Sequence, residues 1–274
     1  MKYTLALLNI LIIVSGCQKA DFDISNLNNH EISVYGHGGM GIGQTYPINS
    51  FESIFHCLSI GTDGTELDVQ MTKDSVLVAF HDRSLDHSTN ISGQIINKTW
   101  DEISDVTYTN PSFTNYKLIS LDELLDNTQN IHDFTFTFDC KLYHSTNDLK
   151  SYYTSYVNAI NKITDKYNLH NNLLIESQDT TFLALLQASN LDHKLFIYPD
   201  SFEEGLKIAK IMNLYGITIS TEKISKAQIE EAHNEGLFVA IWNTRTKKKT
   251  IEAIHKLPDI IQSDKVNYLV NQLK

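Results

Sequence analysis

The chain has 274 residues, which is long enough for one large α/β domain or two small ones. Its 22 basic and 33 acidic residues give a net charge of −11, and it has no basic stripe of the kind that nucleic-acid-binding proteins carry. We therefore expect no nucleic-acid partner, and we interpret the basic run at 244–249 as the solvated start of a helix.

The first 16 residues are typical of a signal peptide. Lys2 precedes an apolar stretch at 3–14, which is shorter than the roughly 20 residues that cross a bilayer. The letters "VSGC" that follow resemble the bacterial lipobox, whose cysteine is lipidated. This resemblance predicts a lipid on Cys17, a polar tether over 17–30, and a membrane-anchored lipoprotein of the bacterial cell envelope, either periplasmic or surface-exposed. An ordinary secretory leader remains the alternative.

Short β-rich runs then alternate with amphipathic helical patterns. The strand candidates are 32–35, 65–69, 76–80, 134–140, 173–176, 195–198, 217–220, 238–242 and 260–262. The helix candidates fall near 50–60, 121–126, 148–167, 180–189, 201–214, 225–235 and 246–256. Alternation of this kind predicts a parallel sheet covered by helices.

One strand candidate is surplus to an eight-stranded barrel. The six residues 70–75 are too few for a parallel crossover, which takes about a dozen or more, so 76–80 should fold back antiparallel on 65–69. The other eight candidates predict a (β/α)₈ TIM-type barrel over 31–274 with a hairpin excursion after its second strand. The polar segment 90–118 should lie over the barrel mouth.

Alternation along two strands suggests a site. Glu66 and Asp68 share one face of the second strand, and Asp139 and Lys141 share one face of 134–140. If the apolar faces meet the helices, these groups point into the barrel near the C-terminal strand ends, where barrel enzymes place their active sites. Clustered carboxylates need a cation, and hard oxygen ligands suit Ca²⁺ or Mg²⁺. A salt bridge from Lys141 to Asp139 or Glu66, without a metal, is the open alternative.

Two histidines and two cysteines complete the candidates. His37 lies in the glycine-rich loop "GHGGMGIG", and His81 ends the hairpin, so that the two imidazoles could act as general base and general acid. Loop residues without a role are the alternative. Cys57 and Cys140 could form one disulfide, but the phase of Cys140 with Phe136 and Phe138 favours a buried apolar role.

The order of these motifs resembles the glycerophosphodiester phosphodiesterase family. The resemblance rests on His37-Gly-Gly, "YPINSFES" (46–53), "GTDGTELDVQMTKDSVLVAFHD" (61–82), "SLDHSTNISG" (84–93), "LISLDELL" (118–125), "FDCK" (138–141), "IWN" (241–243) and "PDIIQSD" (258–264). It spans nearly the whole chain after the leader, and the central block is its most specific part.

The resemblance implies a metal-dependent barrel enzyme that hydrolyses glycerophosphodiesters to an alcohol and glycerol 3-phosphate. By position, its implied metal ligands are Glu66, Asp68 and Asp139, and its implied acid–base pair is His37 and His81. Lys141 matches a phosphate-contacting lysine, and Trp242 matches an aromatic residue that packs against glycerol. The implied reaction begins when the glycerol 2-hydroxyl attacks phosphorus.

Three positions depart from the family pattern. Gly38 stands where an arginine is usual, Ile48 where a glutamate is usual, and Asp139 where the third metal carboxylate is usually glutamate. The missing arginine would remove a charged hydrogen bond to phosphate worth about 1.5–3 kcal/mol. Two alternatives follow: a non-catalytic surface lipoprotein that binds a phosphate-bearing ligand, or a phospholipase-like diesterase that acts on intact lipids and carries an apolar rim at the barrel mouth.

Overall fold

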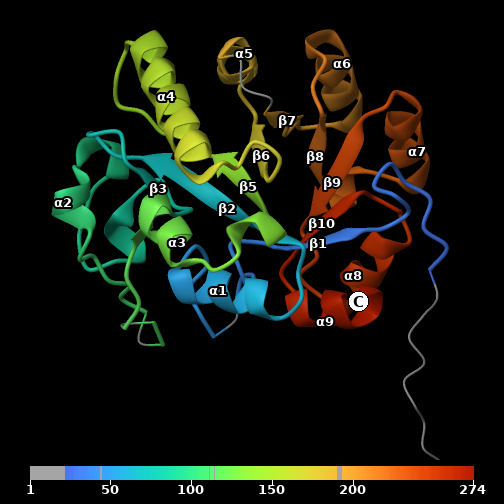
Figure 1. Ribbon diagram of the computed structural model, residues 1–274, viewed down its shortest axis with the longest axis horizontal. Coiled ribbons are helices and arrows are strands. Elements are labelled where there is room, and N and C mark those ends of the chain that lie inside the picture. The colour runs from blue at the N-terminus through green and yellow to red at the C-terminus, as the bar shows by residue number, and fades with distance from the viewer. Residues whose placement is uncertain (1–21, 44, 111, 114, 190–192) are drawn as a thin grey trace, which may run out of the picture.

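A closed barrel of parallel strands forms the centre of the computed structural model, which describes residues 22–43, 45–110, 112–113, 115–189 and 193–274 (Figure 1). Its strands are β1 (Ser33–Gly36), β2 (Gly64–Met71), β5 (Thr135–Cys140), β6 (Leu173–Ser177), β7 (Lys194–Ile197), β8 (Gly216–Ser220), β9 (Phe238–Trp242) and β10 (Ile260–Ser263). Pairing runs from β1 through β10, β9, β8, β7, β6 and β5 to β2, and β2 pairs with β1 to close the barrel. The predicted barrel is confirmed.

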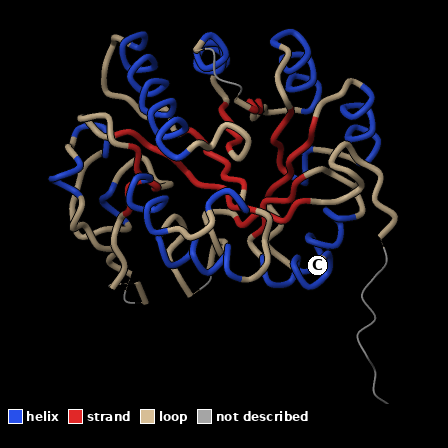
Figure 2. The backbone as a smooth tube through the Cα atoms, viewed as in Figure 1, coloured by secondary structure: helices blue, strands red, loops and turns tan. Residues whose placement is uncertain are grey.

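Helices surround this barrel on its outside (Figure 2). They are α1 (Phe51–Ser59), α3 (Leu121–Asn127), α4 (Leu149–Tyr167), α5 (Thr180–Ala188), α6 (Phe202–Met212), α7 (Lys226–Asn234), α8 (Lys247–Ile254) and α9 (Val266–Leu273). Most begin at a capping side chain, as α1 does where Ser50 accepts the backbone N–H of Ser53. In α4 the residues Tyr153, Val157 and Ile160 recur at helical spacing and are buried against the sheet side.

The strands separate an outer apolar layer from an inner layer that changes character along the barrel. Leu67, Val69, Phe136, Phe138 and Cys140 point outward into the main core shared with the helices. Inside, a small apolar cluster fills one part of the barrel, and its members are Tyr35, Leu174, Phe196, Ala240 and Ile260. Most inward positions towards the C-terminal strand ends are acidic or polar, which makes that end of the barrel suited to chemistry.

The excursion leaves the barrel after β2. β3 (Leu77–Ala79) pairs antiparallel with β2, which confirms the predicted hairpin, and β4 (Ile119–Ser120) pairs antiparallel with β3. A short helix, α2 (Trp100–Ile103), lies between them in sequence. The excursion has a core of its own, formed by Val78, Phe80, Leu85, Ile95, Ile103, Val106, Tyr108 and Leu118. β4, α2 and α9 are elements that the sequence analysis did not predict.

The leader and Cys17 lie outside the described residues. The segment predicted as a tether is described from residue 22 onward, where it lies against the barrel domain: the rings of Phe22 and His255 are 5.5 Å apart, and the backbone N–H of Leu27 donates to Asp259 Oδ1 at 2.9 Å. Among the described helices, none has the length and apolar character needed to cross a membrane. Cys57 and Cys140 are both buried free thiols.

Candidate active site

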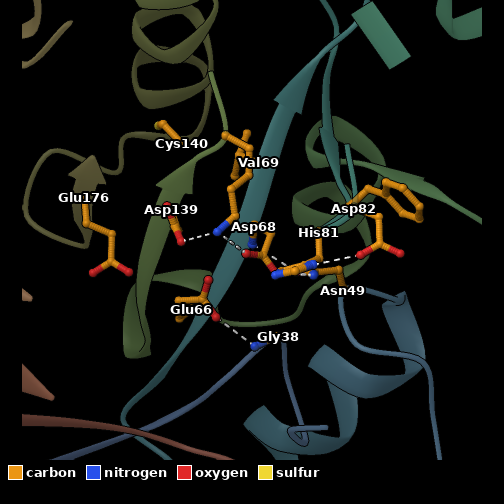
Figure 3. A network of polar contacts seen from close by, with 12 residues as sticks. Gly38, Asn49, Glu66, Asp68, Val69, His81, Asp82, Asp139, Cys140 and Glu176 are labelled. Atoms are coloured by element: carbon orange, nitrogen blue, oxygen red, sulfur yellow. Dashed lines mark hydrogen bonds and ion pairs between the residues drawn. The ribbon is translucent and has the colours of Figure 1, made fainter. Parts of the chain in front are cut away.

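Three carboxylates meet inside the barrel near the C-terminal strand ends. Glu66 and Asp68 come from β2 and Asp139 comes from β5, and the register of the two strands places Asp68 directly beside Asp139. One oxygen from each carboxylate lies within 4.8 Å of the other two, and all three residues are buried. Figure 3 shows them converging from the two neighbouring strands. The structure thus brings together the acids predicted to converge.

Lys141 lies between two of these acids. Its Nζ is 2.9 Å from Asp68 Oδ1 and 2.5 Å from Asp139 Oδ2, and its backbone N–H donates to Val69 O at 2.8 Å. Burial opposes the charge on Lys141, but the two carboxylates outweigh it and raise its pKa above the ordinary value. The salt bridge to Asp139 that the sequence left open is therefore present, and the one to Glu66 is replaced by one to Asp68.

The single ammonium of Lys141 does not neutralise all three carboxylates. Burial and the charge of Asp68 raise the pKa of Glu66 well above its ordinary value, and burial also raises the pKa of Asp139 despite Lys141. For Asp68, burial is outweighed by Lys141 and the nearby imidazoles, so its pKa is lowered. Three buried oxygen donors with a deficit of positive charge fit a divalent cation of the hard type. Their role as metal ligands stays a prediction.

His37 is fixed by a carboxylate at the end of the last barrel strand. Its Nδ1 lies 2.9 Å from Asp264 Oδ1, and its backbone N–H donates to Ser263 O at 3.1 Å. Burial lowers the pKa of this imidazole, but the surrounding carboxylates, Asp264 first among them, outweigh burial and raise it to about 9. With Nδ1 engaged by Asp264, Nε2 is the nitrogen left to exchange a proton with a substrate.

His81 stands at the rim of the site. The backbone N–H of Phe80 donates to Asp68 O at 2.8 Å, so the hairpin returns its next residue, His81, to the cluster. His81 Nδ1 lies 2.9 Å from Asp82 Oδ1, and the side chain of His81 is 51% exposed. The two imidazoles therefore differ: His37 is enclosed beside the acids, and His81 stands at the opening.

Asn49 connects the first loop to the acid cluster. Its Nδ2 donates to Asp68 Oδ2 at 2.7 Å, and its Oδ1 accepts the backbone N–H of Asp68 at 3.0 Å. This pair of bonds fixes one carboxylate oxygen of Asp68 and leaves the other to face Lys141. The sequence analysis did not single out Asn49, because nothing in a loop sequence reveals a contact with a strand 19 residues later.

The two loop departures, Gly38 and Ile48, touch each other. Gly38 has φ +56°, and a Cβ built on it would lie 2.8 Å from the Cβ of Ile48. In this conformation the Gly38 backbone N–H donates to Glu66 Oε2 at 2.9 Å (Figure 3). Glycine suits this position because the positive φ and the close approach of Ile48 disfavour a side chain there.

A fourth buried acid, Glu176, lies on β6 beside Asp139. Its Oε2 accepts Thr218 Oγ1 at 2.6 Å and Gln262 Nε2 at 3.1 Å. Burial first, and then repulsion from Asp139, raise the pKa of Glu176 to about 7 despite these donors. The sequence could have indicated Glu176 as a site residue, since it ends a predicted strand that neighbours the strand carrying Asp139.

A cavity of about 250 Å³ contains these groups, and its wall adds residues from later strands. The predicted Trp242 lines it, together with Tyr198, Arg245 and Gln262. The rings of Trp242 and Tyr198 are 5.6 Å apart in an edge-to-face arrangement. Trp242 Nε1 is buried and has no hydrogen-bond partner among the described residues.

The structure therefore gathers every predicted residue of the barrel site into one cavity: Glu66, Asp68, Asp139, Lys141, His37, His81 and Trp242. Sequence reasoning missed three residues that act on these groups. Asn49 donates to Asp68, Asp264 bonds to His37, and Glu176 lies beside Asp139. Asp264 follows the last strand directly, so its place at the C-terminal end of the barrel was readable, but its contact with His37 was not.

The fold matches solved structures of one kind over most of its length. A glycerophosphodiester phosphodiesterase from Agrobacterium tumefaciens superposes with a TM-score of 0.71, at 18% identity, over 87% of this chain and 99% of that one. A phosphodiesterase from Oleispira antarctica, described in complex with the product sn-glycerol-3-phosphate, superposes with a TM-score of 0.73, at 15% identity, over 86% of this chain and 94% of that one. At these identities the likeness shows a shared fold.

Sequence comparison gives the family. A curated relative, the glycerophosphodiester phosphodiesterase of Bacillus altitudinis, is 41% identical over 63 residues, which cover 23% of this chain and 26% of the relative. The sequence model of the Glycerophosphoryl diester phosphodiesterase family matches residues 40–266, a span that contains the acid cluster, His81, Lys141 and Trp242. The chain belongs to the glycerophosphoryl diester phosphodiesterase family.

Proposed function

We propose that the protein hydrolyses glycerophosphodiesters to an alcohol and glycerol 3-phosphate with the help of a divalent cation. The observation that carries the proposal is the meeting of three buried carboxylates, one ammonium and two imidazoles in a single cavity at the end of the barrel where such enzymes react. Family membership supports the reaction class, and the product held by the Oleispira antarctica phosphodiesterase supports the substrate class.

In this mechanism the two histidines act on opposite sides of phosphorus. His37, held by Asp264 through Nδ1, takes the proton of the glycerol 2-hydroxyl on Nε2. The hydroxyl oxygen bonds to phosphorus as the bond to the departing oxygen breaks. His81, at the open rim, gives its proton to the departing alcohol. Water then opens the cyclic phosphodiester with the two proton transfers reversed, which yields glycerol 3-phosphate.

Other groups bind and orient the substrate. Glu66, Asp68 and Asp139 would hold Ca²⁺ or Mg²⁺, which when bound supplies positive charge beside the phosphate. Lys141 moves from the carboxylates to a phosphate oxygen as a second positive charge. Trp242, which lines the same cavity, packs against the glycerol portion.

The test is release of glycerol 3-phosphate from glycerophosphocholine, measured with Ca²⁺, with Mg²⁺ and with a chelator. We expect release that depends on the cation and falls by about 10² or more in His37→Ala. His132→Ala is the matched control, because His132 is an exposed residue next to the N-terminal end of β5 and should leave the rate unchanged. Turnover that ignores the chelator, or survives in His37→Ala, would refute the mechanism. Binding of glycerol 3-phosphate without turnover of any diester would favour the non-catalytic alternative.

We also propose that the protein is anchored to a membrane of the bacterial cell envelope by a lipid on Cys17, as the lipobox-like "VSGC" suggests. The experiment is metabolic labelling with a fatty acid in cells that express the wild-type chain or Cys17→Ser. Cys57→Ser is the matched control, since Cys57 is a buried thiol of the barrel domain. Label and membrane association should disappear only in Cys17→Ser, and equal labelling of both variants would contradict the anchor.

A further inference from the structure

A second cavity, of about 430 Å³, lies between the barrel mouth and the excursion. Its walls come from two segments far apart in sequence, the loop before α1 and the excursion after β3. The side chains that line it are mainly apolar or aromatic, and they include Ile42, Tyr46, Ile48, Phe80, Tyr108 and Phe113. Its volume falls within the range of about 300–1,000 Å³ that small-molecule pockets occupy.

Contacts across the cavity hold its two walls together. Tyr108 Oη donates to Ile48 O at 3.4 Å, and the rings of Tyr46 and Tyr116 meet edge to face at 5.8 Å. Phe80 and Tyr108 belong to the separate core of the excursion, so that wall rests on packed side chains. We name this cavity the aromatic pocket.

The aromatic pocket adjoins the cavity of the candidate active site. Ile42 and His81 line both spaces. The position of Ile42 is fixed at the site, because its backbone N–H donates at 2.9 Å to the same Asp264 Oδ1 that holds His37. Asp82 engages Nδ1 of His81 on the side away from Asp139 (Figure 3), so Nε2 is the nitrogen that can serve a departing oxygen.

Resting on the function proposed above, we propose that the aromatic pocket receives the departing alcohol and that the preferred substrates are glycerophosphodiesters whose alcohol carries a hydrocarbon group. A phosphorus atom at the acid cluster with its departing oxygen at His81 directs the rest of the alcohol into this pocket. Another cavity, which shares Asp139 and Lys141 with the site, has a mainly polar lining that includes His144 and Asp179 and would favour a hydrocarbon less.

A homologous series of substrates tests the proposal. Glycerophosphodiesters of methanol, propanol, butanol and hexanol differ only in the length of the departing alcohol, and each buried methylene should raise kcat/KM about threefold to fourfold until the pocket is filled. We expect at least a tenfold rise from the methyl to the hexyl diester. A flat series, or faster release from glycerophosphocholine than from the hexyl diester, would overturn the proposal. The proposal would also be overturned if kcat/KM rose only with diesters in which the alkyl chain is attached to the glycerol instead of the departing alcohol.

A binding measurement separates this inference from the proposed function. In His37→Ala with Ca²⁺, calorimetry should give a Kd that falls with chain length in the same order, whether or not the wild-type protein releases glycerol 3-phosphate. If no diester is hydrolysed but Kd still falls with chain length, the hydrolytic function fails and the pocket assignment holds. If glycerol 3-phosphate is released and neither Kd nor kcat/KM depends on chain length, the pocket assignment fails alone.

Matched serine variants locate the effect. Ile42 is 42% exposed at the junction of the two cavities, and Ile211 is 73% exposed on α6 outside both. Ile42→Ser should lower the hexyl-to-methyl ratio of kcat/KM by about threefold or more, since it removes apolar surface from the pocket wall. Ile211→Ser should leave the ratio at the wild-type value. An unchanged ratio in Ile42→Ser, or an equal fall in both variants, would contradict the assignment.

Discussion

Glu176 offers a direct test of the electrostatic account of the site. Replacing it by glutamine keeps the shape of the side chain and an oxygen that can accept from Thr218, but it removes the buried charge. Burial and repulsion from Asp139 raise the pKa of Glu176 from its ordinary 4.5 to about 7. A raised carboxyl pKa stabilises the fold fully below pH 4.5, and this contribution is lost as the pH rises to about 7. The difference corresponds to about 3 kcal/mol.

The measurement is urea unfolding followed by circular dichroism at pH 4.5 and pH 8, in a chelator so that no bound cation adds to the stability. The stability of Glu176→Gln relative to wild type should rise by about 3 kcal/mol between the two pH values. Glu230→Gln, at an exposed position on α7, is the control and should show no such rise. A pH-independent difference for Glu176→Gln would refute the claim that this carboxylate is buried at an electrostatic cost.

Three further outcomes follow from the contacts of the site. Lys141→Met removes the ammonium that two carboxylates share, so calorimetry should find the divalent cation bound roughly tenfold tighter or more, while glycerol 3-phosphate release falls. Equal affinity would show that Lys141 does not compete for these oxygens. Gly38→Arg should lower the free energy of unfolding by about 1–3 kcal/mol and should not restore a phosphate contact, because the positive φ and Ile48 leave no place for a side chain. Urea unfolding measures this effect, and an unchanged midpoint with faster turnover would contradict it. Asp264→Asn should lower the pKa of His37 from about 9 by roughly one to two pH units, which an NMR titration of the imidazole in chelator would record. A pKa that stays near 9 would show that the other carboxylates raise it.

Much of the barrel could be predicted from local patterns. Each barrel strand has a run of apolar or alternating residues, and the six-residue spacer after the second strand excluded a parallel crossover. The two residues of β4 and the four of α2 are too short to show a period, so tertiary contacts define them. The last helix was readable in principle, since Val266, Leu269, Val270 and Leu273 recur at helical spacing.

The residues of the site also separate into those that a local pattern predicts and those that it does not. Glu66 and Asp68 follow from alternation within one strand, and Asp139 joins them because β2 and β5 are neighbours. Asn49 and Asp264 act across the fold, from a loop with a positive φ and from the end of the last strand. No local pattern encodes such contacts, because they depend on the register of strands distant in sequence.

The separate core of the excursion has a consequence for how this protein can diversify. One wall of the aromatic pocket is built on side chains that pack among themselves, apart from the core shared by barrel and helices. Phe80 and His81 tie that wall to the acid cluster, but side chains farther along it, such as Phe113, contact neither the acids nor the main core. If the aromatic pocket receives the departing alcohol as proposed, substitutions at such positions would change which alcohol is accepted and leave the acids of the site in place.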